Sequence, residues 1–228
     1  MILLDSNTLR LTDFFLRDVP EYVILSHTWG EGEVSFQDFQ DLKKIRERQD
    51  FKNLEQCCKK AKSDGLQWVI NSMFRYYSEA AEICYAYVED TDSSVARKHG
   101  SLVGIQLCVW FERGWSIPSM LIAPEIVEIY AKNWKEIGTN SSMVDAISNI
   151  TSIDKSVILH TAHLDDFNVA SRMHWVSKGL TMKEDEMYCL MGIFGVNVPM
   201  LCGEVSRAFQ RLQEEGVMKL TEDYIFFQ

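Results

Sequence analysis

The chain has 228 residues, of which 46% are hydrophobic and 25% charged, and this composition is that of a globular chain that can bury a sizeable core. Its 33 acidic and 23 basic residues give a formal net charge of −10, which argues against nucleic acid or an anionic membrane as the main partner. The apolar start, Met1 to Leu4, is too short for a signal core, and no segment approaches the roughly 20 apolar residues that span a bilayer. We therefore expect a cytoplasmic protein with no membrane span.

Six cysteines show none of the paired spacings that are typical of a zinc site. Most of them lie within apolar segments, so we expect reduced and mostly buried thiols, and no metal site. The six are Cys57, Cys58, Cys84, Cys108, Cys189 and Cys202.

The first strong signal is an apolar run, Tyr22 to Leu25, that leads directly into the polar and aromatic sequence Ser26-His27-Thr28-Trp29-Gly30. This pattern is typical of a buried strand that ends in a turn. In α/β proteins, ligands bind beyond the carboxyl ends of parallel strands. The turn therefore predicts a site that contains a hydroxyl, an imidazole and an indole.

Helices and strands alternate after this turn. Apolar residues from Phe51 to Asp64 follow the spacing of one helix face, and Gly65 is placed to end that helix. We expect a strand over 66–70, a helix over 71–81 and a strand from Ile83 to Val88. This order predicts parallel strands joined by right-handed crossovers, with helices covering the sheet.

The second half of the chain predicts a further strand and then helices. Ile126 to Tyr130 alternates as a strand does, and 133–138 can return as its hairpin partner. Ser141 and Ser142 are placed to cap a helix, and 169–219 is mostly helical in pattern. We predict one domain, 1–228, with an α/β core over 1–138 and a mostly helical extension over 139–228.

A second set of candidate residues is the sequence Arg113-Gly114-Trp115. Its guanidinium and indole suit an anion or a planar ring, although an arginine that neutralises a carboxylate beside a core tryptophan is an equally simple explanation. Ser26 and His27 do not form a catalytic pair by adjacency, since neighbouring strand side chains point to opposite faces, and a structural role for His27 also stays open.

These motifs, taken in order, resemble the fungal heterokaryon-incompatibility (HET) domain. The resemblance covers nearly the whole chain. It rests on ILSHTWG at 24–30, GLQWV at 65–69, NSMFRYY at 71–77, ICYAY at 83–87, RGW at 113–115, LIAP at 121–124, RMHW at 172–175, ED at 184–185, YCLMGIF at 188–194, PMLCGE at 199–204 and AFQRLQEE at 208–215.

The resemblance implies a role in non-self recognition between fungal cells, with the domain acting as an effector of programmed cell death. Such domains are thought to be distantly related to TIR domains, which implies a flavodoxin-like sheet. Some TIR relatives cleave the glycosidic bond of NAD with a glutamate near the nicotinamide ribose. NAD is thus a candidate substrate, and no bound cofactor is implied.

The chain departs from the family pattern at two places. The family has a longer Trp-Ile-Asp-x-x-Cys-Ile-Asp segment where Ile70 is followed directly by Asn71. After Trp115 the family usually has Thr-Leu-Gln-Glu-Leu, whereas this chain has Ser-Ile-Pro-Ser-Met over 116–120. A carboxylate that stabilises a developing oxocarbenium ion is difficult to replace, so these differences weigh against catalysis.

We therefore expect a mainly parallel, flavodoxin/TIR-like α/β fold and a signalling module, degenerate as an enzyme, that acts through protein partners and is compatible with a homo-oligomer. The alternative is an NAD glycohydrolase. In either case Arg113 is expected to bind an anion, Trp29 or Trp115 to stack on a ring, and the glycines to allow close approach of the backbone. The expected site consists of Ser26, His27, Thr28, Trp29, Gly30, Arg113, Gly114 and Trp115.

Overall fold

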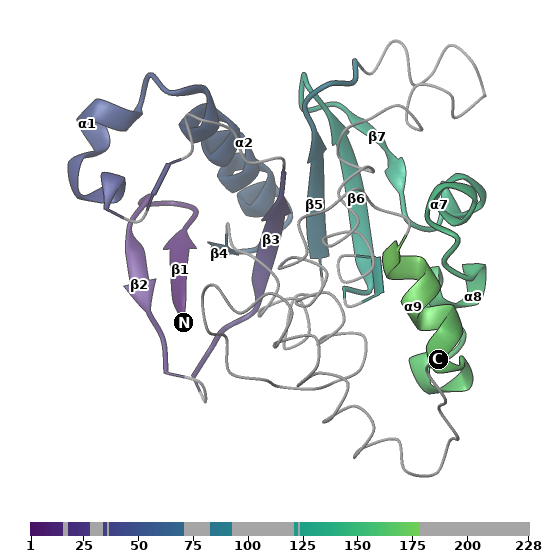
Figure 1. Cartoon of the computed structure of the whole chain (residues 1–228). Coiled ribbons are helices and arrows are strands. Elements are labelled where there is room, and N and C mark those ends of the chain that lie inside the picture. The colour runs from purple at the N-terminus through teal and green to yellow at the C-terminus, as the bar shows by residue number, and fades with distance from the viewer. Residues whose placement is uncertain are drawn as a thin grey trace.

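The computed structural model describes residues 1–15, 18–27, 34–35, 37–70, 83–92, 121–122 and 124–177. These residues form an α/β domain around one seven-stranded sheet in the order β2-β1-β4-β3-β5-β6-β7 (Figure 1). The strands are β1 (Ile2–Asp5), β2 (Leu11–Asp13), β3 (Tyr22–Ser26), β4 (Trp68–Ile70), β5 (Ile83–Val88), β6 (Ile126–Ala131) and β7 (Glu136–Thr139). The helices are η1 (Asp38–Asp41), α1 (Leu42–Ile45), α2 (Gln49–Ser63), α7 (Val144–Thr151), α8 (Lys155–Ile158), η3 (Leu164–Asp166) and α9 (Val169–Ser177).

The centre of the sheet is parallel, as the alternation of helices and strands predicts. β3 pairs in parallel with both β4 and β5, and β5 pairs in parallel with β6. The expectation of a mainly parallel sheet is nevertheless wrong, because three of the six pairings are antiparallel. The hairpin β1–β2 adds one antiparallel edge and β7 adds the other, so the sheet is mixed.

The N-terminal hairpin is held by the side chain of Asp5. Its carboxylate accepts hydrogen bonds from the backbone amides of Asn7 (2.8 Å) and Thr8 (3.0 Å) and from the Gln67 side chain (2.9 Å). Burial opposes ionisation of Asp5, but these hydrogen bonds hold its pKa below the ordinary value. The turn that follows β1 is thereby attached to Gln67, the residue before β4.

Helix α2 confirms the amphipathic pattern of the sequence. It begins at Gln49, two residues before the predicted start, and buries Phe51, Leu54 and Ala61 along one face. Gly65 follows with φ of +81°, the left-handed conformation that favours glycine after a helix end. The Leu66 amide still donates to the Ala61 carbonyl (2.8 Å), which is why β4 starts later than the predicted strand over 66–70.

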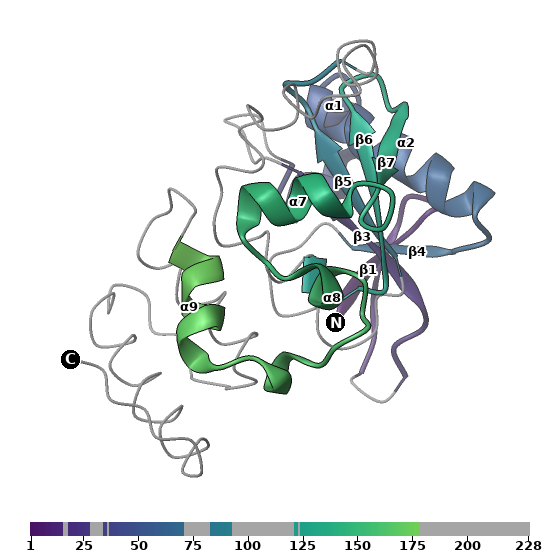
Figure 2. The same cartoon turned by 90° about the vertical axis from the view of Figure 1, so that its right-hand side faces the viewer.

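Two hydrophobic cores lie on opposite faces of the sheet, and Figure 2 shows the helices that cover each face. On one face, α2 packs Leu54 and Cys57 against Val23 and Leu25 of β3. On the other face, Ile24 of β3 belongs to the core that α7, α8 and α9 complete. Both faces of the central strands are therefore buried, which explains their continuous apolar sequence.

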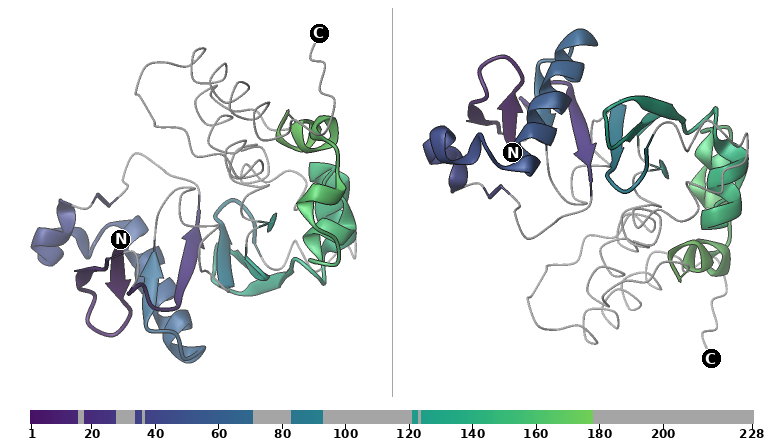
Figure 3. Two further views of the ribbon diagram at one scale, coloured as in Figure 1. Left: turned by 90° about the horizontal axis from the view of Figure 1, so that it is seen from below. Right: turned by 90° about the horizontal axis from the view of Figure 1, so that it is seen from above.

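Helices α7, α8 and α9 follow β7 and gather beside the β5–β6–β7 half of the sheet, whereas α2 lies beside the β1–β4–β3 half (Figure 3). The predicted serine cap of α7 is wrong. The Ser142 hydroxyl accepts from the Thr139 amide (2.7 Å) in the preceding turn, and Met143 occupies the cap position without a side-chain hydrogen bond. The helical pattern of 169–219 is confirmed over α9, and 178–219 lies outside the described residues.

Candidate functional site

Ser26 and His27 stand at the carboxyl edge of the sheet, where the chain changes direction across it. The four parallel strands lie in the order β4-β3-β5-β6. After β3 the chain first forms β4 on one side of it and then crosses to form β5 on the other side. This is a topological switch point, the usual ligand-binding position in open α/β sheets. The strand order puts Ser26 and His27 at this edge, and the presence of a ligand site there stays a prediction.

The two residues differ in their surroundings. Ser26 is 6% exposed and pairs in register with Ala86 of β5. By strand alternation it faces the same core as Ile24, the core completed by α7 to α9. His27 follows the strand and is half-buried.

The remaining candidates lie outside the described residues, so their proximity to His27 stays a prediction. This applies to Thr28, Trp29, Gly30, Arg113, Gly114 and Trp115. It applies equally to the two places where the chain departs from the family pattern, after Ile70 and over 116–120.

The structure adds a segment that sequence reasoning left out of the site, Glu89 to Asp92. It continues from β5 at the edge where His27 follows β3, since Ser26 is level with Ala86 in the register. Glu89, Asp90 and Asp92 are exposed, and Thr91 is buried. The parallel order of the two strands was the signal that could have placed these carboxylates at the same edge of the sheet as the histidine turn.

The turn between β6 and β7 contacts the segment that follows β5. The Lys132 amide donates to the Thr91 carbonyl (2.9 Å), and the Tyr87 hydroxyl donates to the Lys132 carbonyl (3.2 Å). Trp134 stacks on Tyr87 with ring centroids 5.0 Å apart and planes 21° apart. The predicted hairpin partner over 133–138 is confirmed in kind, but its strand begins at Glu136, because 132–134 form the hairpin loop and Lys135 closes it.

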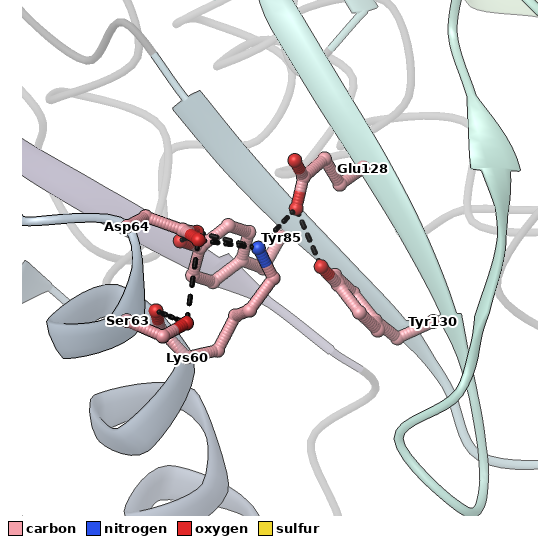
Figure 4. Close-up of polar contacts among 6 residues, drawn as sticks. All are labelled: Lys60, Ser63, Asp64, Tyr85, Glu128 and Tyr130. Atoms are coloured by element: carbon pink, nitrogen blue, oxygen red, sulfur yellow. Dashed lines mark hydrogen bonds and ion pairs between the residues drawn. The ribbon is translucent and has the colours of Figure 1, made fainter.

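A polar network joins α2 to β5 and β6 on the face that α2 covers (Figure 4). The Lys60 ammonium lies 2.6 Å from Asp64 and 3.2 Å from Glu128. The Tyr85 hydroxyl donates to Asp64, and the Tyr130 hydroxyl donates to Glu128 (2.5 Å). We call these five residues the Lys60 network.

The ionisation of the Lys60 network does not suit acid–base chemistry near neutral pH. Burial, and then the hydrogen bonds to carboxylates, raise the pKa of Tyr85 and of Tyr130 well above the ordinary range. Burial alone would lower the pKa of Lys60 and raise that of Asp64, but their hydrogen bonds reverse both directions. The lysine stays charged, Asp64 ionised and the phenols protonated, so the network acts as a structural contact.

The thiols of the described residues are unsuited to nucleophilic chemistry. Cys57, Cys58 and Cys84 are free and buried, as the composition predicts. Burial raises the pKa of all three thiols, that of Cys58 to about 12. Among the same residues, no three histidine, cysteine, aspartate or glutamate side chains are grouped as a metal ion would require.

None of the helices that the structure describes combines the length and the apolar character needed to cross a membrane.

Comparison with known proteins gives one informative similarity. The chain is 36% identical over 221 residues to the vegetative incompatibility protein HET-E-1 of Podospora anserina. The match covers 86% of this chain and 16% of that protein, so the chain spans about one sixth of the length of its relative. No family model matches the chain, and no solved structure matches it.

Proposed function

We propose that the chain is a module for non-self recognition in fungal incompatibility and that it signals programmed cell death through association with other proteins in the cytoplasm. The observation that supports this most strongly is the 36% identity to a vegetative incompatibility protein, which extends over 86% of the chain. The chain corresponds to a small part of that relative. We therefore assign it the role of one module, a HET domain, within such a pathway.

The fold supports the proposed relation to TIR domains. Numbered by their order in the chain, the parallel strands β4, β3, β5 and β6 lie in the order 2-1-3-4. This is the beginning of the flavodoxin-like order. The antiparallel edges β1–β2 and β7 are additions to that core.

The proposed site combines the turn Ser26 to Gly30 with Arg113, Gly114 and Trp115. Arg113 would bind an anion, and Trp29 or Trp115 would offer a stacking surface. Ser26 and His27 are at the switch point. The other residues are assigned from the family resemblance.

Inducible expression of the chain in a fungal host tests the proposed function. We expect arrested growth and loss of viability on induction, abolished by Arg113→Ala in protein that accumulates and folds normally. Arg46→Ala is the matched control, because Arg46 is exposed and lies outside the site. A host that grows normally with abundant folded protein would rule out the effector role.

The alternative function is hydrolysis of NAD to release nicotinamide. It is favoured by the placement of His27 and the acidic segment after β5 at one edge of the sheet, since glycoside cleavage needs a carboxylate near the developing positive charge. Purified protein incubated with NAD gives the test. Sustained nicotinamide release that a single carboxylate substitution abolishes would make the module an enzyme, whereas no release would favour association alone.

A further inference from the structure

Trp134 occupies a backbone conformation that its residue type disfavours. It is the last residue of the three-residue loop 132–134 in the β6–β7 hairpin, and its φ is +56°. The loop is closed by hydrogen bonds from the Trp134 amide to the Ala131 carbonyl (2.8 Å) and from the Ala131 amide to the Lys135 carbonyl (3.0 Å). Glycine or asparagine is the usual residue at this left-handed position, and a large aromatic residue is rare there.

The indole ring packs against aromatic neighbours. The ring stacks on Tyr87, and its centroid also lies 5.6 Å from that of Tyr130. Tyr87 itself is almost fully buried. Strained backbone persists where surrounding contacts determine it, and it concentrates near functional sites.

These contacts continue to the carboxyl edge of the sheet. Tyr87 and Thr91 lie on either side of Glu89 and Asp90, and both are hydrogen-bonded to Lys132, the first residue of the loop that contains Trp134. The loop therefore holds the segment that leaves β5 at two points. That segment leaves the sheet at the same carboxyl edge as β3, where Ser26 and His27 lie, and it begins three residues after Ala86, the register partner of Ser26.

We propose that Trp134 is a positioning residue for the site at the carboxyl edge. Acting through Tyr87 and the loop 132–134, it fixes the segment Glu89 to Asp92 at the edge of the sheet where the Ser26–His27 turn also lies. This inference rests on the proposed function for its biological meaning. Its structural part can be measured independently.

The experiment compares Trp134→Gly with Trp134→Phe. Glycine suits the left-handed backbone but removes the ring, whereas phenylalanine retains a ring that can stack on Tyr87. Hydrogen exchange of the amides of residues 89–92 is expected to accelerate at least tenfold in W134G and to return toward the wild-type rate in W134F. Growth arrest on induction should follow the same order, lost in W134G and restored in W134F. Phe15→Gly is the control, because it removes a ring that is 83% exposed and should change neither measurement.

Wild-type exchange and growth arrest in folded W134G would overturn the proposal. A wild-type chain that never arrests growth would instead contradict the proposed function, while the exchange measurement would still decide the role of Trp134. If W134G does not fold, Tyr87→Phe replaces it, since it keeps the ring and removes the hydroxyl that donates to Lys132 and is also hydrogen-bonded to Asn53. Unchanged exchange over 89–92 in Y87F would then count against the proposal.

Discussion

The ammonium of Lys60, near the end of α2, lies 3.2 Å from the carboxylate of Glu128 on β6. The same ammonium lies 2.6 Å from Asp64, the residue that follows α2, and 5.4 Å from the centre of the Tyr85 ring. One side chain therefore connects the helix on one half of the sheet to two strands on the other half. The side chains of Lys60, Asp64 and Glu128 are 28%, 22% and 20% exposed, so these charges are largely removed from solvent.

Replacement of Lys60 by methionine should destabilise the protein by about 1–3 kcal/mol. It leaves two half-buried carboxylates without their shared cation, a larger penalty than the loss of a surface ion pair. Lys155→Met is the matched control, because Lys155 and Asp145 form a pair at 2.6 Å with side chains 55% and 74% exposed. In urea unfolding, the free energy of unfolding of the control should change by less than about 0.5 kcal/mol. Equal changes in the two variants would contradict a structural role for the Lys60 network.

Asp64 should make the stability of the protein decrease in acid. Burial raises its pKa, but the hydrogen bonds from Lys60 and Tyr85 together lower it by more than burial raises it. The pKa in the folded state is therefore below the ordinary 3.8. A carboxyl with a lowered folded-state pKa contributes stability above its unfolded-state pKa and loses that contribution as the pH falls through the folded-state value.

The measurement is the free energy of unfolding between pH 6 and the acid limit of folding, for wild type and for Asp64→Asn. We expect the wild-type curve to fall as the pH drops below the ordinary aspartate value and the D64N curve to fall less steeply. Parallel curves would show that Asp64 has the same pKa in both states. Asp5, whose pKa is also lowered, accounts for part of the remaining slope.

The sequence predicts those elements whose signals are local. Helix α2 and Gly65 follow from apolar spacing and a glycine at the left-handed position, and Ile83 to Val88 is an apolar run whose bounds coincide with β5. The turn of the β1–β2 hairpin and the turn after β6 lack a glycine at the left-handed position, which Leu9 (φ +54°) and Trp134 (φ +56°) occupy instead. The first turn was therefore not predicted, and the second was located only approximately, between the predicted strands 126–130 and 133–138.

The candidate site could be predicted only as far as one strand determines it. The position of Ser26 and His27 follows from the end of a single apolar run. The position of Glu89 at the same sheet edge depends on β3 and β5 being neighbours, although β4 lies between them in the chain. The Lys60 network likewise joins residues 60, 64, 85, 128 and 130, of which only the Lys60–Asp64 spacing is visible in a helical sequence.

Asn140 should be intolerant of substitution because it connects three segments from a buried position. Its backbone amide donates to the Val127 carbonyl (2.9 Å). Its side-chain Nδ2 donates to the carbonyls of Glu125 and Ile158 (3.2 Å each). The side-chain oxygen also accepts from the Val127 amide (3.3 Å). Asn140→Ala is expected to cost about 2–4 kcal/mol, since it leaves buried backbone groups unpaired.

Asn140→Asp distinguishes this hydrogen-bonding role from packing. The aspartate is nearly isosteric, but its carboxylate cannot donate to the two carbonyls, so at neutral pH it should destabilise at least as much as alanine does. Protonation of the aspartate restores one donor. The loss of stability of N140D relative to wild type should therefore be smaller in acid. Thermal unfolding at neutral and acid pH gives the comparison. A loss of stability that is independent of pH would mean that Asn140 acts through packing and not through its hydrogen bonds.

Gly138 on β7 should tolerate no side chain while Met143 is present. A Cβ atom at this position would lie 2.7 Å from the Met143 sulfur and 2.8 Å from its Cγ, and also 2.8 Å from the Ser142 hydroxyl. Gly138→Ala is therefore expected to destabilise the protein by about 1–3 kcal/mol through overpacking. Met143→Ala alone should also be destabilising, since Met143 belongs to the core beneath α7.

The double variant tests whether these two effects share one cause. With Met143 shortened to alanine, the added methyl group at position 138 gains space, so G138A/M143A should lose less stability than the sum of the single variants. Unfolding free energies of the four proteins give the coupling energy, which we expect to exceed about 0.5 kcal/mol in the favourable direction. Strict additivity would mean that Gly138 is required by its backbone or by Ser142, and that β7 and α7 are not fitted to each other at this contact.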